Sequence, residues 1–556
     1  MDARQTLFKK WIDKNPGDKK WALTMDMPIL IEGSFPFIAP HATEYIIQNF
    51  DGDRGNYNST IDPKYQKLVK EQLEAFVQQN KSSGVNNGAV LVLEYATGDV
   101  VSIIGSNDYF DDSIQGQVKG FSAKRSPGST LKPFIYALAL EQGIIHPNSM
   151  QKDSPQNFGV YTPDNYNSNF KGPVFAWQAL VESRNIPAIN LANSIKNPDL
   201  YDFLKLGNVS GIKERGHYGL SIVLGSAEVT MLELGSLYSL LPNSGEYRGL
   251  NFLKDSIKKA PKQLLTPESS FLAWEAIKRN PSPVAYRPQQ VKNIPIAFKT
   301  GTSIGFKDSW SAGIFDDYVI VVWIGNFDGS GNPAFIGRKM AAPLLFSIAD
   351  AIILEKQPEE KLARIETKVR RVPVCSVSGG IPNKYCTRTL MTGFIPGVSP
   401  ITRCHIHREV YIDTRTGYRT DDSISRFTKK EIREFWPSDL LELFNKAGLP
   451  RLKPPPYPPE NSSNFKNSGY PPRIRSPLDG GIYIIRKETT KHNSIILEAS
   501  SDGDSEKLFW FANDTFLGSG TPTSQIVWSP QPGEFQITTV DDKGRSSSIH
   551  ITVNRG

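Results

Sequence analysis

The hydrophobic positions in the first two thirds of the chain change their spacing several times. Asp62 and Pro63 are typical of a helix N-cap and of a first helical position, and the apolar residues after them recur at helical spacing. Two apolar runs follow, 89–95 and 100–104, with a short turn between them. This pattern predicts a helix and then the first hairpin of a β-sheet.

Helical spacing predominates from residue 129 to about residue 245, and strand-like runs return after it. The expected helices lie at 131–142, 175–181, 229–241 and 338–355. The expected strands lie at 294–302, 310–315 and 318–327. Asp316 and Asp317 join the last two strands into a hairpin. Strands first, helices next, then strands and a closing helix predict an α+β domain at 59–360, with a sheet covered by helices.

The rest of the chain divides by composition into four parts. Residues 1–58 lack a clear period, and residues 361–453 contain all three cysteines. Residues 454–472 are rich in proline, which predicts a stiff linker. Six or seven short strand-like runs within 473–556 predict a small all-β, immunoglobulin-like sandwich.

The composition excludes several classes of protein. With 556 residues, 39% of them hydrophobic, the chain can build large cores, so it is neither a disordered tail protein nor a fibre. The net charge of +7 is small and no long basic run is present, so nucleic acid is not an expected partner. No apolar stretch approaches the ~20 residues of a transmembrane helix, and no signal peptide is recognisable.

Ser129 and Lys132 are the strongest candidates for chemistry. Pro127–Gly128 makes a turn, and the predicted helix places Ser129 in its first turn with Lys132 on the same face. A lysine can act as the base of a serine only if burial or a neighbouring cation lowers its pKa. The chain has other Ser-x-x-Lys pairs, such as Ser210 and Lys213, and an exposed surface pair is the ordinary interpretation of each.

Ser183 and Asn185 form a second motif, Ser-Arg-Asn, after the helix expected at 175–181. In a short loop both side chains can face a cleft, where the hydroxyl would relay a proton and the amide would bind a substrate carbonyl. Taken alone, this motif is more typical of a helix cap.

Lys299, Thr300, Gly301 and Thr302 form the third motif, at the end of the strand expected at 294–302. A glycine in a strand permits the close approach of a peptide backbone. The strand edge could then pair with an extended substrate. An ordinary strand end is the alternative for such a segment in isolation.

The three motifs in this order are known from penicillin-binding proteins and class A β-lactamases. The chain resembles the class A penicillin-binding proteins, and most closely their 1C type, over about residues 25–556. The segments that carry this resemblance include RSPGSTLKPFIYALALEQGIIHP, YTPDNYNSNFKGPV, ESRNIPAINLA, KTGTS, DSWSAGIF and VVWIGNFDG. The resemblance implies the fold of serine β-lactamases and penicillin-binding transpeptidases, an antiparallel sheet covered by helices, for residues 59–360.

The resemblance also implies a reaction. Ser129 would attack the penultimate D-Ala carbonyl of a peptidoglycan stem peptide and form an acyl-enzyme, with Lys132 as its base. Ser183 and Asn185 would assist the proton relay and bind the substrate amide. An amine of a second stem peptide would then complete the cross-link. β-Lactams, which mimic the substrate, would acylate Ser129, and neither a cofactor nor a catalytic metal is implied.

The third motif takes a binding role in the same scheme. Lys299 and Thr300 would hold the substrate carboxylate, Thr302 would add a hydroxyl, and Gly301 would admit the substrate backbone. Backbone N–H groups of Ser129 and Thr302 would form the oxyanion hole.

Two features of the family are not found in this sequence. Members of the 1C type begin with a membrane anchor and a glycosyltransferase domain, so we expect residues 1–58 to be the region that joins the two halves. We then expect no glycosyltransferase activity from this chain, and a glycosyltransferase or membrane-anchored partner that supplies the missing half. The family implies the periplasmic side of the bacterial inner membrane. A split gene, a trimmed chain and an inactive remnant stay open as alternatives.

The three cysteines lie close together in the sequence. Cys375, Cys386 and Cys404, with His405 and His407, could supply four zinc ligands. The spacing is loose and no Cys-x-x-Cys pair is present, which favours one disulfide and a spare thiol over zinc.

Three other functions compete with cross-linking. A β-lactamase is disfavoured by the additional C-terminal segments and by Arg184, where the class A motif has Asp. A sensor or inactive scaffold would be acylated once and stop, and turnover of a stem peptide would exclude it. A D,D-carboxypeptidase would differ only in passing the acyl group to water.

Overall fold

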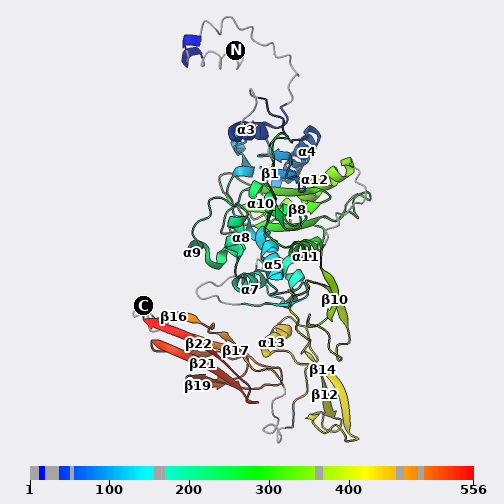
Figure 1. The fold of residues 1–556 in the computed structure, drawn as a ribbon, viewed down its shortest axis with the longest axis vertical. Coiled ribbons are helices and arrows are strands. Elements are labelled where there is room, and N and C mark those ends of the chain that lie inside the picture. The colour runs from blue at the N-terminus through cyan, green and yellow to red at the C-terminus, as the bar shows by residue number, and fades with distance from the viewer. Residues whose placement is uncertain are drawn as a thin grey trace. The chain divides into compact units, whose positions relative to one another are not determined.

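The computed structural model describes residues 12–14, 16–18, 37–50, 56–155, 165, 169–256, 258, 260–356, 367–458, 469–485 and 494–555 (Figure 1). Residues 1–40 form one unit, in which the short helical turn η1 (Pro16–Asp18) is described, and residues 41–556 form a second. Most of the joining region predicted at 1–58 lies outside the described residues.

A five-stranded antiparallel sheet is the centre of the α+β domain, as the sequence predicts. Its strands are β1 (Gly88–Glu94), β2 (Val100–Ile104), β7 (Ala297–Thr302), β8 (Asp308–Phe315) and β9 (Tyr318–Gly325). They are ordered β2-β1-β9-β8-β7, so β7 is an edge strand. Every residue of β8 and β9 is buried, because helices cover both faces of the sheet.

Three helices provide most of this cover. The helices α4 (Pro63–Asn80) and α12 (Ala341–Lys356) contact the sheet and each other, and they enclose a core of aliphatic and aromatic side chains (Figure 1). The helix α10 (Met231–Ser239) contacts β1, β8 and β9. A methyl group on Gly235 of α10 would meet Leu91 and Val321, so the helix lies directly on the sheet.

The remaining helices and short strands of this domain connect and surround the sheet. The helices are α3 (Pro40–Asn49), α5 (Lys132–Glu141), α6 (Ala176–Val181), α7 (Asn185–Ser194), α8 (Leu200–Leu206), α9 (Arg215–Tyr218) and α11 (Pro267–Lys278). The 3-10 turns are η2 (Lys81–Ser83), η3 (Asp112–Ile114), η4 (Gly120–Ser122), η5 (Gly128–Leu131) and η6 (Gly219–Leu224). Two small ribbons pair β3 (Met150–Asp153) with β4 (Gly172–Phe175) and β5 (Glu246–Tyr247) with β6 (Lys262–Gln263).

Side-chain caps set several of the helix boundaries. Asp62 caps α4 through the N–H groups of Lys64 and Tyr65, which confirms the predicted start. The helix predicted at 229–241 begins later, at Met231, because Thr230 and Glu233 form a reciprocal capping box. Such caps satisfy N–H groups that have no partner within the helix.

Residues 367–453 form smaller sheets and one helix. The strands β10 (Arg370–Cys375) and β11 (Thr389–Phe394) make a hairpin. The strands β12 (His407–Asp413), β13 (Arg419–Thr420) and β14 (Thr428–Glu434) make a three-stranded sheet, and α13 (Ser438–Lys446) follows it. Residues 451–458 have no regular secondary structure, and residues 459–468 of the predicted linker lie outside the described residues.

The C-terminal segment is a two-sheet β-sandwich, in agreement with the prediction. One sheet contains β16 (Gly481–Ile485), β18 (Leu508–Ala512), β19 (Thr515–Gly520), β21 (Gly533–Asp541) and β22 (Ser546–Arg555). The other contains β15 (Arg473–Ser476), β17 (Ile495–Ser500) and β20 (Ile526–Trp528). Trp510 lies in the core that the sheets share, whereas Phe509 and Phe511 are half-buried on the opposite face of β18.

None of the described helices is both long enough and apolar enough to cross a membrane.

Two leucines of α12 test the packing of the main core. Leu345 is 0% exposed and Leu354 is 43% exposed, although both belong to the same helix. We expect Leu345→Ala to lower the free energy of unfolding by about 2–5 kcal/mol, because it leaves a cavity in the core. Leu354→Ala is the matched control and should change it by less than about 1 kcal/mol. Urea unfolding of the two variants measures the difference, and equal losses would contradict this packing.

Candidate active site

The prediction that Ser129 lies in the first turn of an α-helix is wrong. Ser129 lies in the 3-10 turn η5, because α5 begins only at Lys132. The turn is fixed from within, since the N–H and the hydroxyl of Thr130 both donate to the Pro127 carbonyl, at 3.2 and 2.9 Å. The Tyr238 hydroxyl donates to the Thr130 carbonyl at 2.7 Å. Ser129 itself is half-buried, so it stays partly accessible just before the start of α5.

The backbone of this turn lies directly against strand β7. A Cβ on Gly301 would lie 2.2 Å from the Pro127 carbonyl oxygen, and a Cβ on Gly128, where φ is +52°, would lie 2.6 Å from the Thr302 carbonyl oxygen. On its other side Gly128 is approached by Gly225, whose Cβ would lie 2.4 Å from the Gly128 nitrogen. The three glycines therefore allow three backbone segments to meet without side chains between them. The sequence predicts that a substrate backbone approaches Gly301. In the structure, the backbone that approaches Gly301 is that of Pro127, in the protein itself.

Lys132 is fully buried, and its ammonium group is held by the Ser-Arg-Asn motif. Its Nζ donates to the Ser183 carbonyl at 2.8 Å, to the Arg184 carbonyl at 3.2 Å and to Asn185 Oδ1 at 2.6 Å. Burial lowers the pKa of Lys132 well below its usual value, and the nearby charges of Lys299 and Arg184 lower it further. These are the conditions under which a lysine can act as a base.

The Ser-Arg-Asn motif forms the link between α6 and α7. Ser183 has a left-handed backbone, with φ of +59°, and Asn185 is the first residue of α7. Interpretation of this motif as a helix cap is wrong, because the N-cap is Arg184 and its side chain makes no capping hydrogen bond. The Ser183 hydroxyl and the Asn185 amide instead accept hydrogen bonds from two lysines.

A buried ion pair that the sequence does not predict holds the Ser-Arg-Asn motif in place. Arg184 Nε donates to Asp153 at 2.6 Å, and both side chains are buried. Asn165 bridges the two parts, because its amide donates to Asp153 at 2.8 Å and its oxygen accepts from the Asn185 N–H at 2.9 Å. In the sequence, Arg184 stands out only as a departure from the β-lactamase motif, and Asp153 belongs to no recognisable pattern.

Lys299 meets the same motif from the opposite side. Its Nζ donates to the Ser183 hydroxyl at 2.8 Å and to the Thr300 carbonyl at 2.9 Å. Burial lowers the pKa of Lys299 to about 7, and the positive charge of Arg338 contributes. The Ser183 residue thus touches both lysines, the first through its carbonyl and the second through its hydroxyl.

The other residues of the third motif lie along the edge strand β7. Thr300 and Thr302 are half-buried, and the Thr302 hydroxyl accepts a hydrogen bond from the Gly337 N–H at 3.0 Å. β7 pairs with β8 on one side only, so the predicted sheet edge is confirmed. A cavity of about 510 Å³ lies beside this edge and the Ser129 turn, lined by residues that include Ser126, Gly225, Ser226, Ser303 and Lys307.

The comparisons with known proteins agree with this geometry. Residues 88–340 match the penicillin binding protein transpeptidase domain, and all eight predicted site residues fall within this match. Residues 366–409 match the C-terminal domain of penicillin-binding protein 1A, and residues 462–552 match the Penicillin-Binding Protein C-terminus Family.

Individual relatives extend the likeness along the chain. Penicillin-binding protein 1C of Escherichia coli is 26% identical over 93% of this chain and 67% of its own length. Penicillin-binding protein 1A of Neisseria lactamica is 29% identical over 45% of this chain and 33% of its own length. The chain thus spans about two thirds of the first relative and about one third of the second.

The solved structures support the fold. The crystal structure of penicillin-binding protein 1A from Haemophilus influenzae superimposes with a TM-score of 0.56 at 18% identity, covering 72% of this chain and 82% of that one. The sequence resemblance and the α+β fold predicted from it are therefore confirmed. Its transpeptidase, 1A-type and C-terminal segments each match a separate model of penicillin-binding proteins, so the likeness of this chain to the penicillin-binding proteins extends over most of its length.

Proposed function

We propose that this protein is a serine-type D,D-transpeptidase that cross-links peptidoglycan stem peptides through an acyl-enzyme on Ser129. The observation that carries the proposal is the pair of buried lysines, Lys132 and Lys299, joined through Ser183. One lysine must be neutral to accept a proton, and the other must be charged to bind a carboxylate. Their surroundings favour this division, since the pKa of Lys132 is well below its usual value and that of Lys299 is about 7.

The first half of the reaction forms the acyl-enzyme. The neutral amine of Lys132 takes the hydroxyl proton of Ser129, and the serine oxygen attacks the penultimate D-Ala carbonyl of the stem peptide. Backbone N–H groups of Ser129 and Thr302 stabilise the developing oxyanion. The C–N bond to the terminal D-Ala breaks, and the proton held by Lys132 passes to the leaving amine, with the Ser183 hydroxyl as relay.

Substrate binding uses the edge strand β7. The stem peptide lies along the free edge as an extended chain, and Asn185 donates to its backbone carbonyl. The ammonium of Lys299 and the hydroxyls of Thr300 and Thr302 receive the terminal carboxylate. The charge of this carboxylate favours the protonated form of Lys299 when substrate is bound.

The second half of the reaction transfers the acyl group. An amine of a neighbouring stem peptide loses a proton to Lys132 and attacks the ester carbonyl. The ester C–O bond breaks, Lys132 returns the proton to the Ser129 oxygen, and a new amide bond remains. The proposed place of action is the periplasmic side of the bacterial inner membrane, where this substrate lies. A partner that supplies a glycosyltransferase stays a prediction.

The nucleophile is tested by covalent labelling with a fluorescent penicillin. The unaltered chain should carry one adduct, and Ser129→Ala should carry none, because no other hydroxyl replaces the serine oxygen. Ser210→Ala is the matched control, since Ser210 also begins a Ser-x-x-Lys pair but is exposed, and its labelling should be unchanged. An adduct on Ser129→Ala would refute this nucleophile. Incubation with stem peptides then separates cross-linked product, release of D-Ala without cross-links, and no turnover.

The contact between the turn and the strand is tested by a single added methyl group. Gly301→Ala places a carbon 2.2 Å from the Pro127 carbonyl, and this clash must push the turn that carries Ser129 away from β7. We expect the second-order rate constant of penicillin acylation to fall by about 100-fold, the order of effect of a 1 Å misplacement. Gly249→Ala is the control, because nothing lies within 4 Å of its added carbon. A normal rate for Gly301→Ala would contradict the proposed alignment.

The pH profile tests the role of Lys299. Its charged form is lost as the pH rises through about 7, whereas burial lowers the pKa of Lys132 well below its usual value. The second-order rate constant of acylation by penicillin, which bears a carboxylate, should therefore fall above pH 7 by up to about tenfold per pH unit. In Lys299→Arg the guanidinium stays charged, so a slower enzyme should show no such decline up to pH 9. Identical declines in both proteins would exclude Lys299 as the titrating group.

A further inference from the structure

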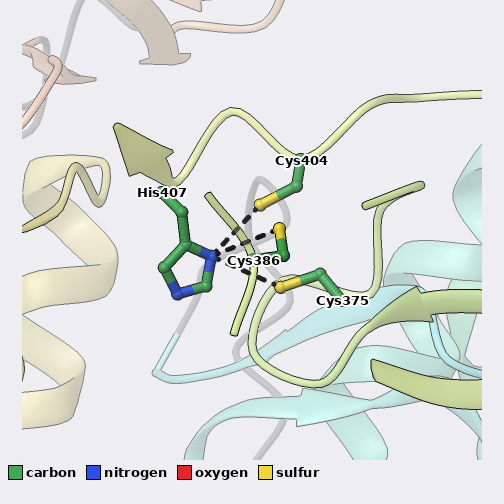
Figure 2. Close-up of side chains that lie close together, drawn as sticks. All are labelled: Cys375, Cys386, Cys404 and His407. Atoms are coloured by element: carbon green, nitrogen blue, oxygen red, sulfur yellow. Dashed lines mark hydrogen bonds between the residues drawn. The ribbon is translucent and has the colours of Figure 1, made fainter. Parts of the chain in front are cut away.

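A second cluster of reactive side chains lies outside the active site, within residues 367–453. Cys375, Cys386 and Cys404 are all free, so the disulfide favoured by the sequence analysis is absent from the structure. Their sulfur atoms surround Nδ1 of His407, at distances of 3.5, 3.6 and 3.5 Å respectively (Figure 2). All four of these atoms lie within 4.8 Å of one another.

This arrangement does not fit hydrogen bonding alone. One imidazole nitrogen carries either one hydrogen or one lone pair in the ring plane, so it can satisfy only one thiol at a time. Three sulfurs at nearly equal distances from the same nitrogen instead mark the corners of a tetrahedron. With Zn–S bonds of about 2.3 Å and a Zn–N bond of about 2.0–2.1 Å, a tetrahedral ion separates nitrogen from sulfur by about 3.6 Å.

We propose that Cys375, Cys386, Cys404 and His407 bind one zinc ion. Three thiolates and one imidazole are an established structural zinc set, whereas magnesium and calcium require oxygen ligands. The three thiols lose their protons when the ion binds. Because four protein ligands complete the tetrahedron and three of the four side chains are buried, the site has no open position for a substrate, and the ion is structural.

Surrounding contacts hold the ligands in position. The Asn383 amide donates to the Cys404 carbonyl at 2.7 Å and to the His407 carbonyl at 2.9 Å, which fixes the segment between these two ligands. The Cys386 N–H donates to the Asn383 carbonyl at 3.1 Å, and the Val377 N–H donates to the Cys375 sulfur at 3.5 Å. Such contacts orient ligands before the ion arrives.

The far side of the histidine ring has a carboxylate neighbour. Nε2 of His407 lies 4.0 Å from Glu434 Oε1. Glu434 is held by the Trp436 indole N–H at 2.8 Å and by two hydrogen bonds from Arg451, at 2.7 and 2.8 Å. A carboxylate behind a metal-bound histidine favours the tautomer with the proton on Nε2, which leaves Nδ1 free to bind the ion.

The position of the cluster suggests what the ion does. Cys375 ends β10, Cys386 follows in the β10–β11 connection, and His407 begins β12, so the ligands join the hairpin to the three-stranded sheet. The two buried cysteines share a small core with Trp436 and Phe444. A zinc ion at this point would cross-link the β10–β11 hairpin to the start of β12 beside this core.

The site is tested first by metal content. The full chain, purified under reducing conditions, should contain about one zinc ion per molecule by elemental analysis. His407→Gln and Cys386→Ser should each lower the zinc affinity by at least about 100-fold, since loss even of an outer contact costs 10- to 100-fold. His405→Gln is the matched control: His405 is two residues away, but its ring packs on Tyr470, and this variant should keep its zinc.

A second measurement uses the unaltered sequence, so it does not depend on the folding of a variant. Zinc is removed with a chelator and cobalt(II) is added to the reduced protein. We expect thiolate-to-cobalt charge-transfer absorption and the visible bands of a tetrahedral ion at about one equivalent. Absence of these bands, normal zinc affinity in His407→Gln, or a disulfide within the cluster of the freshly isolated protein would overturn the proposal. Neither readout requires the enzyme to be active.

Discussion

The candidate active site depends on a contact between two backbones that no side chain separates. The turn that carries Ser129 lies against strand β7, and glycines at 128 and 301 are the reason the two can approach so closely. The turn comes from the start of α5 and the strand from the edge of the sheet, about 170 positions later in the sequence. Any side chain at Gly301 would separate the turn that carries Ser129, the proposed nucleophile, from β7, the strand proposed to bind the substrate.

The second constraint is electrostatic. Two lysines are fully buried and joined through one serine, an arrangement that costs free energy because each charge loses its water. The buried ion pair of Arg184 and Asp153 holds the loop that both lysines touch. The same burial that opposes folding makes the two amines differ from ordinary lysines, and this difference is what acyl transfer requires.

The sequence predicts the sheet and the motifs well, because both are local patterns. The hairpin turn at Asp316–Asp317 and the cap at Asp62 follow from neighbouring residues alone. Two of the eight strands of the sandwich, β15 and β19, are not predicted by their sequences, because one is rich in arginine and the other in glycine, so neither has the apolar alternation of a strand.

Contacts between distant residues account for the other differences. Asp153 contacts Arg184 only because the fold brings β3 and the Ser-Arg-Asn loop together, and the spacing of these two residues in the sequence does not predict the contact. Cys386 likewise meets the other ligands only through the fold. The interval Cys404-x-x-His407 is a signal in the sequence, because a cysteine and a histidine with two residues between them can bind the same ion.

Ser183 has a left-handed backbone, so the residue that would be best for the stability of the protein at this position differs from the residue that the proposed reaction needs. Residues other than glycine adopt this backbone conformation at a cost of about 1–2 kcal/mol, whereas glycine adopts it freely. Replacement by glycine would therefore relax the loop and yield a more robust protein, but it would remove the hydroxyl that Lys299 contacts. Selection for thermal tolerance alone would favour glycine at this position, whereas the proposed proton relay requires the serine hydroxyl.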